Sequence, residues 1–344
     1  MRFDDLAKLA VSSGASDLIL TAGNPPVMRR NGELAKSEGA AFSPADTEIL
    51  LQQVLTDDQR RRFEEAGEID LSYSIFGTGR FRICGFRQRG SVGLAVRIIP
   101  SAMRSATKLG IPDAVMSFAH ETGGLLLIGG PPASGRTTTL ATVVDSINQV
   151  RAAHVVSLEA PVEYTLRHKL GVVHQREIGL DTASFAAGMR AAMHQSADVI
   201  VVGNLEDEIV PLVLDAASGR VLVVAVVTAR GVRDALTGIV QRFSAQTQVE
   251  AARQLAAVLR GASCQQLLRR ADRSGLLAAF EVLTVGAEAR RAIANQQWAD
   301  LGRLIDSGSN PGTVSMQTAV LQLLATGEID HAEYTDAAAL LSST

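Results

Sequence analysis

The chain has 344 residues and a formal net charge of −3, with 33 basic and 36 acidic side chains. This near balance gives no reason to expect nucleic acid or an anionic membrane surface as a partner. Hydrophobic residues make up 47% of the sequence, enough for sizeable cores, and the length suits about two domains. The two cysteines, Cys84 and Cys264, lie far apart and indicate neither a disulfide framework nor a zinc site.

The amino-terminal segment MRFDDLAKLAVSSGASDL carries acids at Asp4 and Asp5 and no long apolar core, so it does not resemble a secretory signal. The longest apolar run, Val221–Val227, is far shorter than the roughly 18 residues of a membrane-spanning helix. We therefore expect a cytoplasmic protein that inserts into no membrane and reaches one only through a partner.

The first hundred residues mix helix and strand signals and predict an α+β domain over residues 1–100. The expected helices are Phe3–Ser13, Pro44–Val54 and Asp57–Glu65, and the expected strands are Asp17–Thr21, Ile69–Ile75, Arg80–Phe86 and Val92–Ile98. The polar, proline-bounded stretch that follows predicts a linker at 101–114.

Residues 115–344 begin with apolar strands that alternate with helices, a pattern typical of a parallel sheet covered on both faces. The expected strands are Leu125–Ile128, His154–Leu158, Val199–Val202 and Val221–Val227, and the helices between and after them are Thr137–Asn148, Ser184–Met193, Val210–Ala217 and Arg233–Phe243. From about Val249 the pattern predicts a mostly helical tail: Glu250–Arg260, Ala287–Asn295, Trp298–Asp306, Thr313–Ala325 and Asp330–Leu341.

One stretch, LLLIGGPPASGRTTTL, has the frame of a phosphate-binding loop, G-x-x-x-x-G-K-[ST], with Arg136 in the lysine position. It follows an apolar strand and opens a helix, an arrangement that aims backbone N–H groups at an anion. The expected nucleotide-binding residues are Gly130, Pro131, Pro132, Ala133, Ser134, Gly135, Arg136, Thr137 and Thr138. Thr137 stands where a hydroxyl would bind Mg²⁺, and the alternative is a plain Gly-Pro turn between strand and helix.

Motifs along nearly the whole chain resemble, in the same order, those of the bacterial secretion ATPase superfamily, most closely the type IV pilus retraction ATPases PilT and PilU. They are GASDLIL and AGNPPVMRRNGEL near the start, GRFRICGFRQRG at 79–90, HVVSLEAPVEY at 154–164, HQREIGLDTASF at 174–185, DVIVVGNLED at 198–207 and VSMQTAV at 314–320. The resemblance implies a PAS-like amino-terminal domain and a RecA-like P-loop ATPase domain with a helical tail. It also implies ATP and Mg²⁺ as cofactors and a hexameric ring with nucleotide at the subunit interfaces.

The loop departs from the family pattern GPTGSGKST at two important positions. Arg136 keeps the positive charge, but a guanidinium is a broad planar fork and not a compact ammonium. Ala133 replaces a glycine, and if that position needs φ > 0, alanine costs about 1 kcal/mol or more.

Three further motifs have lost side chains that the resemblance assigns to hydrolysis. The Asp box, usually E-D-P-I-E, reads EAPVE here, so Ala160 replaces the aspartate. Its second glutamate, Glu163, either orients water or is a solvated loop carboxylate. The Walker B segment has Asn204 for the usual glutamate, and an amide cannot accept a proton as a carboxylate does; Glu206 replaces an arginine.

The His box, usually G-T-L-H-T, reads AVVTA at 225–229, and the sequence has no histidine between His194 and His331. Loss of one general base typically costs ~10²–10⁴ in rate. The four changed motifs therefore predict weak or lost ATP hydrolysis, with weak or absent ATP and Mg²⁺ binding.

Arg82 and Arg97 match positions from which, by the resemblance, arginines reach a neighbouring subunit's nucleotide; the alternative is that they are solvated strand-end arginines. Such residues act as an arginine finger does. The segment EARRAIAN at 288–295 matches the family's AIRNLIRE element, needed for retraction, clearly at Arg290 and Ile293 alone, which argues against autonomous retraction.

The sequence thus predicts a PilT/PilU-like accessory or regulatory subunit in a homo- or hetero-hexamer with PilT-type ATPases, held at the inner membrane by the pilus platform protein. Two alternatives stay open: an active motor that works with Arg136, and an interaction protein that binds no nucleotide. The basic clusters Arg60–Arg62 and Arg269–Arg273 are expected to be solvated helix faces and not a nucleic-acid site.

Overall fold

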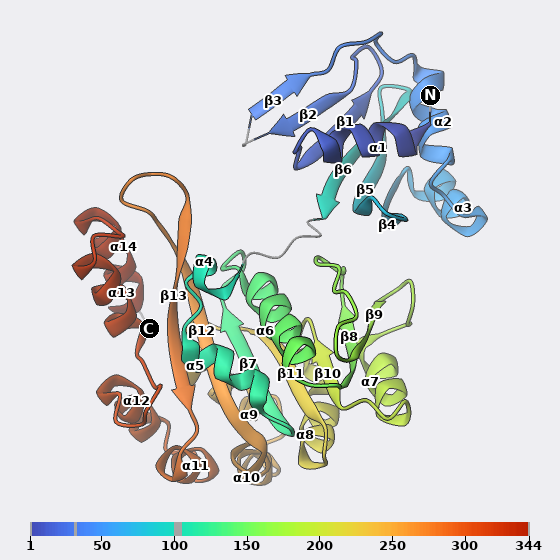
Figure 1. Cartoon of the computed structure of the whole chain (residues 1–344). Coiled ribbons are helices and arrows are strands. Elements are labelled where there is room, and N and C mark those ends of the chain that lie inside the picture. Colours follow the sequence, from blue (N-terminus) through green and yellow to red (C-terminus); the bar gives the residue numbers. More distant parts are fainter. Residues whose placement is uncertain (1, 31–32, 100–104, 343–344) are drawn as a thin grey trace. The chain divides into compact units, whose positions relative to one another are not determined.

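The computed structural model describes residues 2–30, 33–99 and 105–342, and the chain divides into two compact units (Figure 1). The division falls between residues 102 and 103, and Glu163–Thr165 is grouped with the first unit. The first part of the expected linker, 101–104, lies outside the described residues. The remainder of it contains the short helix α4 (Ala106–Leu109) and the start of α5 (Asp113–Met116), both in the second unit.

The first unit is built on an antiparallel sheet with the order β3-β2-β1-β6-β5-β4. Its strands are β1 (Asp17–Thr21), β2 (Val27–Arg30), β3 (Glu33–Lys36), β4 (Glu68–Ile75), β5 (Gly79–Gln88) and β6 (Ser91–Ile99). Its helices are α1 (Phe3–Ser12), α2 (Pro44–Gln52) and α3 (Asp57–Ala66). Ser43 and Thr56 begin α2 and α3 with capping boxes, which satisfy backbone donors at each helix start.

Alternation of side chains gives this sheet one buried and one exposed face. In β1, Leu18 and Leu20 are fully buried among residues of α1 and α2, whereas Asp17 points to the other face. The open face therefore carries charged side chains of the sheet, Asp17 among them.

The second unit is built on a sheet with the order β13-β12-β7-β11-β10-β8-β9, parallel except for β13, which pairs antiparallel with β12. Its strands are β7 (Gly124–Gly130), β8 (His154–Glu159), β9 (Val172–Glu177), β10 (Val199–Val202), β11 (Leu222–Thr228), β12 (Leu259–Arg269) and β13 (Leu276–Thr284). Its longer helices are α6 (Arg136–Val150), α7 (Phe185–His194), α8 (Val210–Ser218), α9 (Val232–Gln241), α10 (Gln248–Val258), α11 (Ala287–Ala294), α12 (Trp298–Ser307), α13 (Met316–Ala325) and α14 (His331–Ser342).

Both faces of this sheet are covered. In β7, Leu125 and Leu127 join a core with α7 to α12, while Leu126 and Ile128 join a second core with α5 and α6. A strand buried on both faces reads as a continuous apolar run, which is why β7, β10 and β11 were readable from the sequence. Helices α13 and α14 pack on the β12–β13 hairpin in a smaller cluster around Leu268, Leu277 and Met316.

The expectation of a mostly helical tail is wrong for residues 259–284, which form β12 and β13. The runs LRGASCQQLL and LLAAFEVL are too rich in Leu, Ala and Gln to show strand propensity, and their pairing with β7 is decided by tertiary contacts. The expected helix Glu250–Arg260 accordingly ends at Val258, and Arg269–Arg273 lies at the end of β12 and in the following turn and not on a helix. Strands β2, β3 and β9 were also not predicted; each is short and lies at or next to a sheet edge.

Across the described parts of the chain, every helix is too short or too polar to traverse a bilayer.

Candidate functional site

The loop between β7 and α6 adopts a backbone that glycine alone suits at two places. Gly130 has φ +152° and Gly135 has φ +87°. A Cβ added at Gly130 would collide with the Ser134 hydroxyl and the Gln265 carbonyl oxygen, so this position has no room for a side chain. The Gln265 side chain donates from Nε2 to the Ser134 carbonyl oxygen at 2.7 Å and ties the loop to β12.

This backbone suits a phosphate group. Helix α6 begins at Arg136, and the first N–H groups of a helix have no acceptor within it. They lie at the positive end of the helix dipole, where anions are stabilised. The Ser134 hydroxyl is buried and has no hydrogen-bond partner among the described residues, which leaves it as a donor for a ligand.

Ala133 lies in the left-handed region with φ +63°, a conformation that favours glycine. The positive φ brings the alanine Cβ close to the backbone, so alanine lowers the stability of this loop conformation by about 1 kcal/mol or more relative to glycine. The surrounding structure therefore holds the loop in this conformation although alanine disfavours a positive φ.

Arg136 is half-buried and contacts the neighbouring strand. Its Nη1 donates to the Thr228 hydroxyl at 2.6 Å. Thr228 ends β11 and is paired in register with Gly130 on β7, so the guanidinium spans from the helix start to the end of the neighbouring strand.

The carboxyl ends of β8 and β10 place Glu159 and Asn204 at the same edge of the sheet. Glu159 is buried, and its Oε1 accepts from the Ser157 hydroxyl at 2.6 Å and from Gln175 Nε2 at 3.0 Å. A Cβ added at Gly203 would come within 3.3 Å of Glu159, which puts this carboxylate beside the end of β10. Asn204 is exposed.

Glu163, expected to orient water, is exposed on the loop between β8 and β9, four residues beyond the strand end that Glu159 occupies. The residue that sequence reasoning missed is Glu159. It could have been predicted from its position, because it directly follows the expected strand His154–Leu158 and parallel strands bring their carboxyl ends to one edge of the sheet.

The same residues fit Mg²⁺ poorly. Mg²⁺ is held in phosphate sites through one or two carboxylates together with substrate phosphates. Thr137 offers a half-buried hydroxyl, Asn204 is an amide, and Glu159 accepts two protein hydrogen bonds at its Oε1. Within residues 2–30, 33–99 and 105–342, no group of three or more His, Cys, Asp or Glu is arranged to hold a metal ion.

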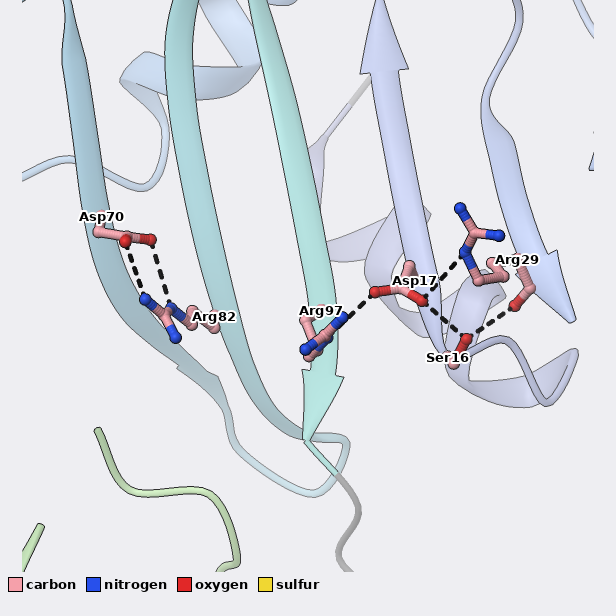
Figure 2. A network of polar contacts seen from close by, with 6 residues as sticks. All are labelled: Ser16, Asp17, Arg29, Asp70, Arg82 and Arg97. Atoms are coloured by element: carbon pink, nitrogen blue, oxygen red, sulfur yellow. Dashed lines mark hydrogen bonds and ion pairs between the residues drawn. The ribbon is translucent and has the colours of Figure 1, made fainter. Parts of the chain in front are cut away.

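In the first unit, Arg82 and Arg97 lie on the open face of the sheet, and each contacts a carboxylate (Figure 2). Arg82 donates to both oxygens of Asp70, at 3.4 Å from Nε and 2.9 Å from Nη2. Arg97 Nε donates to Asp17 at 3.2 Å, and Arg29 approaches the other oxygen of Asp17 at 3.6 Å.

The register explains this arrangement. Arg82 on β5 and Arg97 on β6 are directly opposite each other, and like charges opposed across strands are destabilising. Asp17 and Asp70 flank the two guanidinium groups and offset that repulsion. Arg97 still exposes 72% of its side chain and Arg82 47%, so both keep donors for a further anion. Together with Cys84 and Arg29 they line a pocket of about 390 Å³.

A second titratable residue was missed by the sequence reasoning. Glu281 on β13 is buried opposite Cys264, and burial raises its pKa to about 7, with a further contribution from Asp306. The Val232 backbone N–H and Arg233 act in the opposite direction. A lone glutamate inside the apolar run LLAAFEVL was the available signal.

Comparison with known proteins decides the family. The sequence profile described as "Type II/IV secretion system protein" matches residues 80–316, more than half of the chain. The chain belongs to this family and is of the PilT/PilU type.

Two curated relatives and one crystal structure show how far the likeness extends. The type IV pilus ATPase PilU of Pseudomonas aeruginosa is 32% identical over 96% of this chain and 87% of its own length. The uncharacterized protein YggR of Escherichia coli is 34% identical over 96% of this chain and all of its own length. The crystal structure of the pilus retraction motor PilT with bound ADP superposes with a TM-score of 0.90 at 34% identity, covering 98% of this chain and 97% of that one.

The fold class expected from the sequence is thereby confirmed: an amino-terminal α+β unit and a carboxyl-terminal RecA-like ATPase unit. This secretion-ATPase-type fold brings the loop 130–138, Thr228, Asn204 and Glu159 to one edge of the second sheet. Glu163 lies on the loop that follows that edge, and Arg82 and Arg97 belong to the other unit.

Proposed function

We propose that this chain is an accessory or regulatory subunit of a PilT/PilU-like type IV pilus motor that binds nucleotide at residues 130–138 and hydrolyses ATP weakly or not at all. One observation carries the proposal. The loop has a backbone suited to phosphate, at Gly130, Gly135 and the start of α6, while Asn204, after the end of β10, offers no carboxylate.

The two properties respond to different parts of the site. Backbone donors bind phosphate without regard to the neighbouring side chains, so affinity survives their replacement in part. Hydrolysis depends on several groups placed together, because phosphoryl transfer is catalysed by positioning and charge stabilisation. A site with the first and without the second binds nucleotide and turns it over slowly.

Equilibrium binding of Mg-ATP to the purified chain tests the first half. The expected dissociation constant is nearer ~1 mM than ~1 µM, a difference of about 4 kcal/mol. A micromolar or tighter constant would contradict weak binding and favour the active motor. Failure of millimolar ATP or ADP to raise the melting temperature would favour an interaction protein without nucleotide.

We propose further that Arg82 and Arg97 serve a neighbouring subunit's nucleotide in a homo- or hetero-hexamer with PilT-type ATPases. The support is their exposed donors on the open sheet face. Arg82→Ala and Arg97→Ala should leave this chain's own affinity nearly unchanged and lower the turnover of an active PilT-type partner in a mixed ring. If both variants leave mixed-ring turnover at the parent level, the trans-acting role is wrong.

In this proposal the ring works in the cytoplasm and reaches the inner membrane through the pilus platform protein. Co-purification with the motor components, with ATP turnover measured on the same sample, tests the partners and the activity together.

A further inference from the structure

Two histidines lie side by side on the last two strands of the second sheet. His154 begins β8, and His174 lies two positions beyond Val172, the register partner of His154 on the parallel edge strand β9. Residues two apart on a strand point to the same face, so the two imidazoles share one face of the sheet. The pair belongs to the amino end of β8, whereas the loop 130–138 lies at the carboxyl edge of the sheet.

The two rings are spaced as a pair of metal ligands would be. His154 Nε2 and His174 Nδ1 are 2.9 Å apart, and the ring planes cross at 90°. Two nitrogens bound to one ion at about 2.0–2.1 Å, at right angles to each other, are about 2.9 Å apart. At a tetrahedral angle they would be about 3.3 Å apart. Right-angled nitrogen ligands are typical of tetragonal Cu²⁺ and Ni²⁺, so the spacing favours these ions.

The pair can receive an ion without losing a proton to solvent. In the absence of an ion the same spacing is an N–H···N hydrogen bond, and the tautomers decide which ring donates. When a metal ion arrives, the donor ring carries its proton on its other nitrogen instead. Both facing nitrogens then present lone pairs, and two coordinate bonds replace one hydrogen bond.

A third imidazole lies nearby but is engaged elsewhere. The ring centroid of His168 is 6.5 Å from that of His174. His168 Nδ1 accepts a hydrogen bond from the Val173 backbone N–H at 3.1 Å, so the neutral ring has its proton on Nε2 and no lone pair for a metal. The protein therefore supplies two ligands and water completes the shell. Since His174 is exposed and His154 half-buried, solvent can reach the pair.

We propose that His154 and His174 bind a divalent transition-metal ion of the Cu²⁺ and Ni²⁺ class. The bound ion joins β8 to the edge strand β9 through side chains, in addition to the backbone pairing of the two strands. This site is separate from the proposed nucleotide site and does not depend on it.

The test is equilibrium binding of Ni²⁺ to the full-length chain without an affinity tag, in a buffer that does not coordinate metals. The expected dissociation constant is below about 100 µM. The Cu²⁺ complex should bind more tightly, as its place in the Irving–Williams order requires. Its electron paramagnetic resonance spectrum should show coupling to two imidazole nitrogens. A spectrum with one nitrogen ligand or none overturns the proposal.

Three variants locate the ligands. His174→Asn and His154→Gln should each weaken Ni²⁺ binding about tenfold or more. His331→Gln is the matched control, because it removes an exposed imidazole at the start of α14 and should leave the affinity unchanged. Equal losses in all three variants, or no loss from His174→Asn, contradict the proposal.

Thermal unfolding gives a second readout that does not rely on the binding isotherm. A ligand that binds the native chain alone stabilises it in proportion to the logarithm of its concentration over the dissociation constant. Ni²⁺ at ten times the dissociation constant should raise the melting temperature of the parent by about 2–4 °C. The same concentration should leave His174→Asn nearly unchanged, and EDTA should reverse the rise in the parent. A rise of equal size in His174→Asn would show that the ion binds elsewhere.

Discussion

The body of the second sheet and its carboxyl edge follow different rules. Every residue of β7 from Gly124 to Gly130 is buried, and β11 is buried through Val227. At the carboxyl edge, β11 ends at the exposed Thr228, Asn204 follows β10 and is exposed, and the loop after β7 holds Ala133 at a positive φ. The comparison teaches that apolar packing in the body specifies the fold, whereas the side chains at the edge decide what the site can bind and catalyse.

A substitution in the body should have the largest effect on stability. Leu126→Ala removes a fully buried side chain from the core between β7 and α6 and should lower the free energy of unfolding by about 2–5 kcal/mol. Denaturant unfolding followed by circular dichroism measures this. Leu170→Ala, at a side chain that is 63% exposed, is the matched control and should change stability by less than about 0.5 kcal/mol. Similar costs at both positions would break the distinction between body and surface.

Glu281 tests the comparison from the other side, because it is an ionisable side chain buried within the body of the sheet, on β13. Its pKa rises from 4.5 in the unfolded chain to about 7 in the fold, chiefly through burial. Its contribution to stability is therefore fully present below about pH 4.5 and is lost as the pH rises through about 7. Across that window the loss amounts to roughly 3 kcal/mol.

Glu281→Gln should remove this part of the pH dependence. The difference in free energy of unfolding between variant and parent should shift in favour of glutamine between pH 5 and 8. Glu288→Gln, an exposed carboxyl on α11, serves as the control and should show no such trend. A parent and Glu281→Gln variant with parallel pH profiles would show that Glu281 stays ionised in the fold.

Ala133→Gly should have a smaller effect and of opposite sign. Glycine relieves the φ of +63° and should raise the free energy of unfolding by about 0.5–1 kcal/mol. Ala191→Gly in α7 is the counterpart at a helical position, where glycine should lower stability by about 0.5–1 kcal/mol. Thermal unfolding of both variants beside the parent measures the pair, and destabilisation by Ala133→Gly would show that the loop does not strain alanine.

Prediction from the sequence succeeded where one physical signal was strong. The apolar runs of β7, β10 and β11 and the glycine spacing of the loop each point to one structure. It failed at β12 and β13, where strand formation depends on pairing with β7 and the local sequence gives Ala, Gln and Leu without period-two alternation.

The site divides in the same way. The backbone conformation at Gly130, Gly135 and Ala133 could be predicted because glycine is the residue that most readily adopts a positive φ. The contact between Arg136 and Thr228 was not, since it joins residues 92 positions apart whose side-chain conformations depend on the packed sheet. Glu159 was overlooked for Glu163 because the exact end of β8 decides which carboxylate faces the edge.

Phosphate release from ATP tests the central claim most directly, measured on the parent chain beside the single variants Arg136→Lys, Asn204→Glu and Ala160→Asp. The account predicts near-background release from all four, because each variant restores one group and leaves the others absent. A rise of about tenfold or more from Arg136→Lys alone, worth about 1.4 kcal/mol in barrier, would contradict it. The site would then be an ATPase that lacks only its lysine.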